Sequence, residues 1–219
     1  MSAGAFRGEA AGLVLSSTSD HGSLVERGEA LKRLAKSGLL VDRAVTRLKK
    51  MKHGVMTAAR LVGEVCQRSK VRHRPAMITL TYAPGADWRP RHLSEFLHLA
   101  RQFCKKAGKS FRYVWVAEMQ ERGVVHYHVI VWLPKGFKLP KPDERGWWPH
   151  GMSNIQWAKK AAGYLAKYAS KGQEPGAPAF PKGIRISGNG GLDAEGRREF
   201  RFWRAPSEAR EFLGSGADI

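Results

Sequence analysis

The sequence predicts an α+β fold, in which an antiparallel sheet packs against helices. Three observations favour this class. Short runs of β-branched and aromatic residues near the middle of the chain are typical of strands. Two stretches between and after those runs repeat apolar residues at helical spacing. The chain has 219 residues, 42% of them hydrophobic, which is enough for one domain with a core and an extension.

The N-terminal part reads differently from the rest of the chain. Residues 1–22 are rich in Ser, Gly and Ala, and we expect them to be disordered. In residues 23–72 apolar residues recur at helical spacing between Lys and Arg, notably in RLKKMKHG at 47–54, so we expect one to three basic helices. This extension either packs onto the core with a solvated basic face or forms an arm that contacts DNA.

We expect the core domain at residues 73–175. MITLTYAP at 77–84 predicts a first strand, which ends at Pro84 and Gly85. Residues 91–106 have the apolar spacing of an amphipathic helix that ends before Gly108. FRYVWVAEM at 111–119 and VVHYHVIVWL at 124–133 then predict two strands, which QERG joins.

The second half of the core begins with a loop rich in Pro, Gly and Trp at 134–151. Ser153 and Gln156 have the spacing of a capping box, which predicts a helix from there to about Lys171. In the C-terminal segment, 176–219, we expect one further strand, either REFRFWRA at 198–205 or GIRIS at 183–187. The resulting order is the βαββαβ or ferredoxin-like arrangement, which RRM modules share: an antiparallel sheet with two helices on one face.

Charge and cysteine content limit the partners and the compartment. The formal net charge is +19 and the sequence pI is about 10.4, which fits a polyanionic partner, with nucleic acid ahead of a membrane surface. A generally basic, solvated surface is the alternative. No apolar run approaches the ~20 residues that cross a bilayer, and the N-terminus lacks the pattern of a secretory signal. Cys66 and Cys104 form no C-x-x-C pair, so we expect a cytoplasmic protein with no membrane partner.

Two histidines lie one residue apart in the strand predicted at 124–133. Because side chains alternate along a strand, His126 and His128 share one face. If Glu121, Arg122 and Gly123 form a three-residue hairpin loop, position 118 lies opposite 126, and Glu118 joins the histidines on their face. Two imidazoles and one carboxylate make a three-ligand metal site with open positions, which is typical of a catalytic metal. A structural histidine pair is the alternative.

The helix predicted after residue 153 presents tyrosines amid lysines. At 100° per residue, the apolar positions 158, 161, 162, 165, 166 and 169 cluster on one side, and Lys160, Tyr164, Lys167, Tyr168 and Lys171 cluster on the other. Two phenols among ammonium groups suit a reaction with phosphate, because the cations favour the attacking phenolate and neutralise charge at phosphorus. Alternatively, these are surface tyrosines that stack on bases or pack against a loop.

These residues together resemble the motifs of a known superfamily. His126-Tyr127-His128 resembles the histidine–hydrophobe–histidine motif of the HUH endonucleases, and ITLTY at 78–82 resembles their first strand motif. YLAKYASK at 164–171 is similar to the double-tyrosine motif of phage rolling-circle replication initiators of the microvirus A-protein and inovirus type. GWWPHG at 146–151 also resembles this group. The motifs follow one another in the family's order.

The resemblance implies a site-specific, single-strand DNA nickase and strand transferase that initiates rolling-circle replication of a phage or plasmid. His126 and His128 would hold Mg²⁺ or Mn²⁺, with Glu118 as the third ligand from the hairpin argument. Tyr164 and Tyr168 would be the nucleophiles that form a 5′-phosphotyrosine, and Lys167 would contact the phosphate. For DNA binding we single out Lys160, Lys171, Arg122 and Trp148, although Trp147 and Trp148 alternatively close the loop over the core.

The expected partners are single-stranded or origin DNA, with a host helicase and polymerase in the bacterial cytoplasm. A separate helicase is expected because the sequence contains no Gly-rich loop ending in Lys-Ser or Lys-Thr. Other functions stay open on the same fold. These are a two-tyrosine transposase, a non-catalytic DNA-binding protein and, ranked last, an RNA-binding module of the RRM type, which usually displays aromatic residues on its sheet face.

Overall fold

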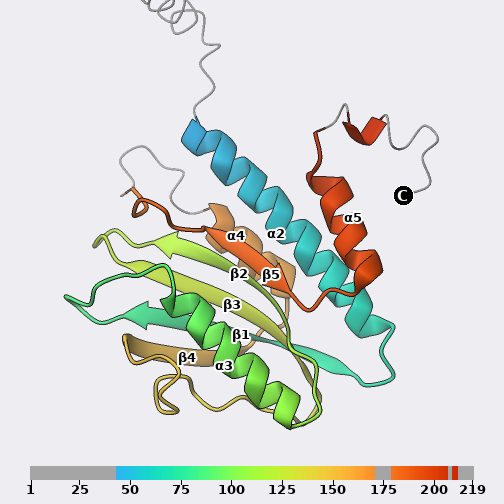
Figure 1. Cartoon of the computed structure of the whole chain (residues 1–219), viewed down its shortest axis with the longest axis horizontal. Coiled ribbons are helices and arrows are strands. Elements are labelled where there is room, and N and C mark those ends of the chain that lie inside the picture. Colours follow the sequence, from blue (N-terminus) through green and yellow to red (C-terminus); the bar gives the residue numbers. More distant parts are fainter. Residues whose placement is uncertain (1–42, 171–178, 207–208, 212–219) are drawn as a thin grey trace, which may run out of the picture. The chain divides into compact units, whose positions relative to one another are not determined.

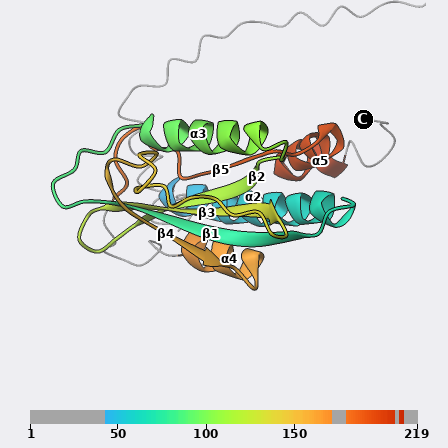
Figure 2. The ribbon, with the colours of Figure 1, turned by 90° about the horizontal axis from the view of Figure 1, so that it is seen from below.

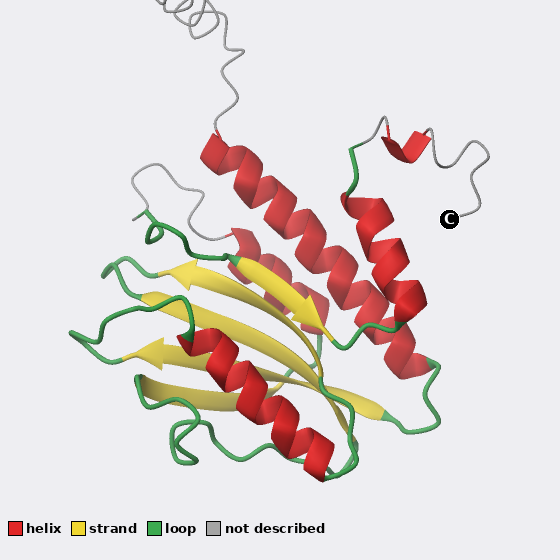
Figure 3. Cartoon of the chain, viewed as in Figure 1, coloured by secondary structure: helices red, strands yellow, loops and turns green. Residues whose placement is uncertain are grey.

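The structure of the chain, a computed structural model, describes residues 43–170, 179–206 and 209–211, all within the unit Asp42–Ile219. The disorder expected at 1–22 lies outside the described residues, and the domain boundaries drawn from the sequence stay a prediction. The described helices and strands are α2 (Arg43–Gln67), β1 (His73–Tyr82), α3 (His92–Lys106), β2 (Arg112–Met119), β3 (Val125–Pro134), β4 (Gly151–Trp157), α4 (Ala161–Ser170), β5 (Ser187–Gly190) and α5 (Ala194–Arg204) (Figures 1 and 3).

The strands form a five-stranded sheet in the order β4-β1-β3-β2-β5, and each neighbouring pair is antiparallel. This confirms the expected α+β class with an antiparallel sheet. The central strand is β3, whose ten residues are all buried. A strand covered on both faces reads as a nearly continuous apolar run, so the two histidines within it stand out.

The hairpin between β2 and β3 confirms the predicted register. Glu118 lies opposite His126, and the Gln120 N–H donates to the Val124 carbonyl at 3.0 Å. Gly123 has a φ of 75°, the left-handed conformation that a three-residue hairpin loop needs and that glycine adopts without a steric penalty.

The helices cover both faces of the sheet, which differs from the expected placement on one face. Figure 2 shows α3 on one side of the strands and α4 on the other. The right-handed rule for parallel crossovers explains this difference. Both crossovers, β1-α3-β2 and β4-α4-β5, move across the sheet in the same direction, but their strands run in opposite directions. Two right-handed connections of this kind must pass over opposite faces.

The expectation of a helix starting near Ser153 is wrong, because that segment is β4. The edge strand pairs with β1 over Gly151–Trp157, and α4 begins only at Ala161. The Ser153 hydroxyl, which a capping box would direct to a helical N–H, donates instead to Asp143 Oδ1 at 2.6 Å. Pairing with a distant strand therefore overrides a local sequence signal.

The prediction of a strand at 198–205 is also wrong, because these residues lie mainly in α5. Asp193 caps this helix by accepting the Gly196 N–H at 2.8 Å. The alternative segment, GIRIS, leads into the last strand. β5 begins at Ser187, and the Ile186 carbonyl accepts the Ala117 N–H at 2.9 Å.

The first strand begins four residues earlier than its apolar pattern predicts, at His73, and includes Pro75. The Pro75 carbonyl accepts the Ala158 N–H at 2.9 Å, so the backbone polar groups of this residue point towards the β4 side. The missing proline N–H therefore removes no hydrogen bond between β1 and the central strand β3.

The helix α2 packs an apolar stripe against the sheet and neighbouring helices, which is one of the two alternatives for the basic extension. Its buried residues recur at helical spacing: Leu48, Met51, Val55, Ala58, Ala59, Leu61, Val62, Val65 and Cys66. Lys49, Lys50 and Lys52 are exposed on the same helix. Within the described ranges, no helix combines the length and the apolar character needed to span a bilayer.

Candidate active site

The residues at the centre of the candidate site lie on the sheet face that α4 covers. Glu118 comes from β2 and His126 and His128 come from β3, and all three side chains are buried. The ring of Tyr168, from α4, stacks on the ring of His128 with centroids 3.5 Å apart and an interplanar angle of 11°. The structure therefore brings together two predicted histidines, the predicted carboxylate and one predicted nucleophile.

Hydrogen bonds orient the His128 ring. Its Nε2 lies 2.5 Å from Glu118 Oε2, and its Nδ1 lies 3.4 Å from the Thr79 hydroxyl. An ionised carboxylate only accepts hydrogen bonds, so Nε2–H donates to Glu118. In the neutral ring Nδ1 then accepts from the Thr79 hydroxyl. These contacts offset the cost of burying an imidazole that is only 4% exposed.

Thr79 is a site residue that the sequence reasoning missed. It lies directly opposite His128 in the pairing of β1 with β3. The alternation of Thr79 and Thr81 with Leu80 in ITLTY was the available signal, because it places both hydroxyls on one face of the strand and Leu80 on the other.

The three expected metal ligands do not form a preformed cage in the described residues. No group of three or more His, Cys, Asp or Glu side chains in that part of the chain has the geometry of a metal site. Glu118 bonds His128 directly, and the ring centroids of His126 and His128 are 6.4 Å apart. The donor types suit a divalent ion, since imidazole and carboxylate are common ligands of Mn²⁺ and related metals. The metal stays a prediction.

Two faces of α4 differ in exposure. Leu165 and Ala169 are buried, and Tyr168, one position before Ala169, points with them to the sheet. Tyr164 is 36% exposed. The two tyrosines therefore do not share one environment, as the helical projection had suggested. Ala162, which that projection placed on the buried side, is exposed.

The expected phosphate and DNA contacts are spread around the site. Lys167 is exposed, with its Nζ 5.8 Å from the centroid of the Tyr168 ring. Lys160 is exposed just before α4, and Arg122 is exposed in the hairpin loop, where its Nε donates to Gln120 Oε1 at 2.8 Å. Lys171 lies outside the described residues.

Trp148 does not have the exposure that stacking on a base requires. It is fully buried on the opposite side of the sheet, donates from Nε1 to the Thr81 carbonyl at 3.1 Å and meets the Tyr82 ring edge-on at 5.0 Å. Trp147 packs against Phe103 at 5.4 Å. The loop at 134–151 thus closes over the core, which is the alternative that the sequence left open, and buried Trp148 offers no free ring face to DNA.

Comparison with protein families gives one match. Residues 75–173 match the family described as replication-associated protein ORF2. This part of the chain is similar to replication-associated proteins. The matched segment, a little under half of the chain, includes Glu118, both histidines and both tyrosines of α4. The match supports a role in replication initiation and is consistent with interaction with DNA. No curated protein and no solved structure matched the chain.

Proposed function

We propose that the chain is a site-specific, single-strand DNA nickase and strand transferase of the HUH type, which initiates rolling-circle replication of a phage or plasmid in the cytoplasm of a bacterial host. The observation that supports this most is the stack of Tyr168 on His128, because it puts a phenol beside a buried histidine–carboxylate pair. The similarity of residues 75–173 to replication-associated proteins supports the same reading.

The reaction that suits these groups is a transesterification at phosphorus. The Tyr168 phenol loses its proton, and its oxygen attacks the scissile phosphate. The bond from phosphorus to the 3′ oxygen breaks, and that oxygen leaves as a 3′-hydroxyl after gaining a proton. The 5′ phosphate stays on the tyrosine, so its bond energy is kept for the later rejoining step. Lys167 supplies positive charge near the reacting phosphate.

The buried face would hold the divalent metal through His126, His128 and Glu118. A bound Mg²⁺ or Mn²⁺ would act as a Lewis acid on a phosphate oxygen. For His128 to donate the Nε2 lone pair, its proton must move to Nδ1, where Thr79 Oγ1 is placed to accept it. Glu118 must also give up its hydrogen bond to Nε2.

The different exposure of the two tyrosines assigns them different roles. Tyr168 is in contact with His128, so we assign it the first cleavage. Tyr164, one turn away on α4 and exposed, would cut the regenerated junction after one round of synthesis.

A covalent adduct assay tests the proposal. The full chain is incubated with Mn²⁺ and single-stranded DNA from its own replicon, labelled at the 3′ end in one sample and at the 5′ end in another. We expect a denaturant-resistant protein–DNA adduct that retains the 3′ label, while the 5′ label leaves on a free fragment. Label retention in the opposite sense would contradict a 5′-phosphotyrosine.

Variants assign the roles of the residues. Tyr168→Phe should lower adduct formation at least about 10³-fold, His126→Ala with His128→Ala should abolish it with DNA affinity mostly kept, and Tyr164→Phe should leave one cleavage event. Tyr127→Phe, which removes a hydroxyl on the opposite face of the sheet, is the matched control and should cleave normally. Intact DNA binding with no adduct in any sample would favour a non-catalytic DNA-binding protein.

A further inference from the structure

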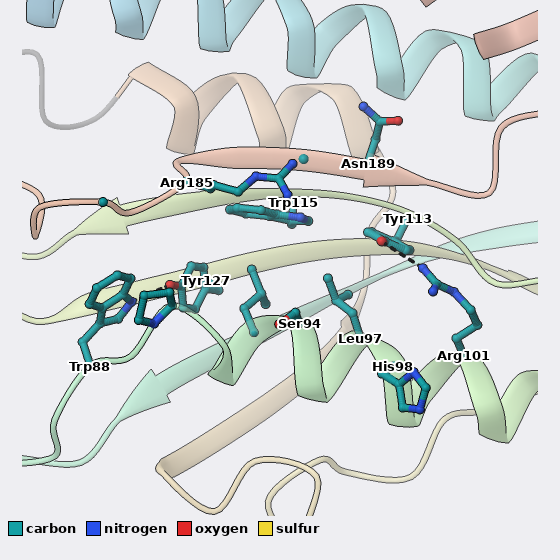
Figure 4. A pocket seen from close by; sticks show the side chains of 14 residues that line it. Trp88, Ser94, Leu97, His98, Arg101, Tyr113, Trp115, Tyr127, Arg185 and Asn189 are labelled. Carbon is teal, nitrogen blue, oxygen red and sulfur yellow. Dashed lines mark hydrogen bonds between the residues drawn. The ribbon is translucent and has the colours of Figure 1, made fainter.

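A cavity of about 340 Å³ lies on the sheet face opposite the histidines, between α3 and the strands β2, β3 and β5 (Figure 4). Tyr113, Trp115 and Tyr127 project into it from the sheet. Ser94, Leu97 and Arg101 line it from α3, and Arg185 comes from the segment before β5. None of these residues belongs to the site proposed for cleavage.

Glycines in β5 make room for the aromatic side of this cavity. A Cβ at Gly188 would lie 2.6 Å from Trp115 Nε1, and a Cβ at Gly190 would lie 2.6 Å from the Tyr113 ring. Trp115 meets Tyr127 edge-on at 5.8 Å, and Trp88 Nε1 donates to the Tyr127 hydroxyl at 2.7 Å. Trp88, at one end of the cavity, is the more exposed of the two tryptophans. The sequence thus builds a cavity with one aromatic side.

The charge of the cavity is positive. Its lining includes Arg101 and Arg185, both exposed, and no carboxylate. Arg101 Nη2 donates to the Tyr113 hydroxyl at 3.2 Å, and its guanidinium lies 6.0 Å from the centroid of that ring. Neither arginine forms an ion pair with a residue in the described ranges. Two arginines without a carboxylate beside an aromatic surface suit a flat ligand that has an anionic group.

We propose that this cavity binds one nucleotide of a single DNA strand, with the base beside Trp88 and the aromatic side chains and the phosphate at Arg101 and Arg185. Its volume is within the range of small-ligand sites, and aromatic rings with arginines are the usual partners of unpaired bases. The inference rests on the single-strand binding of the proposed function and not on cleavage. The bound nucleotide would flank the scissile position, because the two sites lie on opposite faces of one sheet.

A binding assay without cleavage tests this site. Fluorescence anisotropy measures the affinity of the full chain for a labelled single-stranded 15-mer in EDTA. Two pocket variants are used: Arg101→Ala with Arg185→Ala, which removes the cations, and Ser94→Trp, which fills the cavity from α3. The control, Lys105→Ala with Lys106→Ala, removes two charges from the same helix outside the cavity. Circular dichroism checks that each variant is folded.

We expect both pocket variants to bind at least about fivefold more weakly than wild type, the lower limit for stacking of one base on an aromatic ring. The lysine control should lose less than about twofold. A strand containing 5-iododeoxyuridine should crosslink on irradiation to Trp88, Tyr113, Trp115 or Tyr127, as mapped by mass spectrometry.

Three outcomes would overturn the site. Equal losses in the arginine and lysine variants would mean general charge attraction. Crosslinks confined to α4 and the histidine face would place the strand elsewhere. Displacement of a fluorescent mononucleotide by unlabelled dTMP, with strand affinity unchanged in the pocket variants, would assign the cavity to a free nucleotide. Each leaves the adduct assay intact, so failure of this inference is distinct from failure of the proposed nickase.

Discussion

At the scale of single residues, the histidine face depends on partners that alternate along neighbouring strands. Glu118 could be predicted from the sequence, because the register of a short hairpin follows from its loop length. Thr79 could not, since it depends on the pairing of β1 with β3, which lie far apart in sequence. The stack of Tyr168 on His128 was missed for a similar reason: a helical projection shows which residues share a side, but not which side meets the sheet.

Thr79→Val tests the role of the hydroxyl at His128. The variant keeps the shape of the side chain but removes the acceptor that the metal-binding tautomer needs. We expect Mn²⁺ affinity and adduct formation to fall about 10- to 100-fold, the usual cost of losing a partner behind a metal ligand. Isothermal titration with Mn²⁺ measures the first and the adduct assay measures the second. Thr79→Ser should restore both; failure of serine to do so would mean that packing, not the hydroxyl, matters.

The two cysteines illustrate what burial does to a reactive group. Burial raises the pKa of both Cys66 and Cys104 to about 11, although the charge of Arg112 slightly opposes this at Cys66. Because the thiolate is the reactive form, both side chains are inert at neutral pH and act as small apolar core residues.

At the scale of helices and strands, prediction succeeded where the signal was local. The α3 helix and the β2–β3 hairpin have caps, turns and periodicity within their own residues. The edge strand β4 depends on β1, about 75 residues away in sequence, and its Ser153 matched a helix signal by coincidence. In α5 the alternation of REFRFWRA outweighed real helix signals, namely Asp193 at the N-cap, Glu195 in the first turn and two arginines in the last turn.

Asp143 joins the loop at 134–151 to β4. Its carboxylate accepts the Ser153 hydroxyl and N–H and lies 3.3 Å from Lys141 Nζ. Partial burial raises the pKa of Asp143, but these hydrogen bonds outweigh that effect and lower the pKa from 3.8 to about 2. A lowered pKa in the folded state gives stability that is complete above the ordinary value and is lost as the pH falls through about 2.

Asp143→Asn should therefore unfold at lower urea concentration than wild type at pH 7, by about 1 kcal/mol in the free energy of unfolding, since solvent screens an acid near the surface. This difference should shrink between pH 4 and pH 2. Urea titrations of both proteins at pH 7, 4, 3 and 2.5 measure it. The exposed Asp87→Asn is the control, and a difference that stays constant down to pH 2.5 would contradict the role of the charge.

At the scale of the whole described unit, helices and loops cover both faces of the sheet. The α2 and α4 helices pack on the histidine face, and α3 packs on the other (Figure 2). Trp115 and Tyr127 are 5% and 2% exposed, so the sheet does not offer the open aromatic platform of RNA-recognition modules. With a net charge of +19, attraction to a nucleic-acid strand is spread over the surface, for example at the lysines of α2.

Affinity for single-stranded DNA should therefore fall steeply with salt. If about six phosphates are neutralised, the dissociation constant rises on the order of 10²-fold between 50 and 200 mM NaCl, because bound counterions are released on association. Anisotropy titrations across that range measure the slope. An uncharged strand of the same base sequence is the control and should show little salt dependence. A flat response of the natural strand would refute binding dominated by phosphates.

The spacing of the two tyrosines on α4 has a mechanical consequence. Four residues of helix separate Tyr164 from Tyr168, a rise of about 6 Å along the axis. If both phenols act in turn on one phosphate position, the helix and the DNA must change register by one helical turn between the two cuts. Continuous ladders on both sides of β3 hold His126 and His128 in place. The sheet is then the fixed part of a two-position ratchet, and α4 or the strand beneath it is the part that slides.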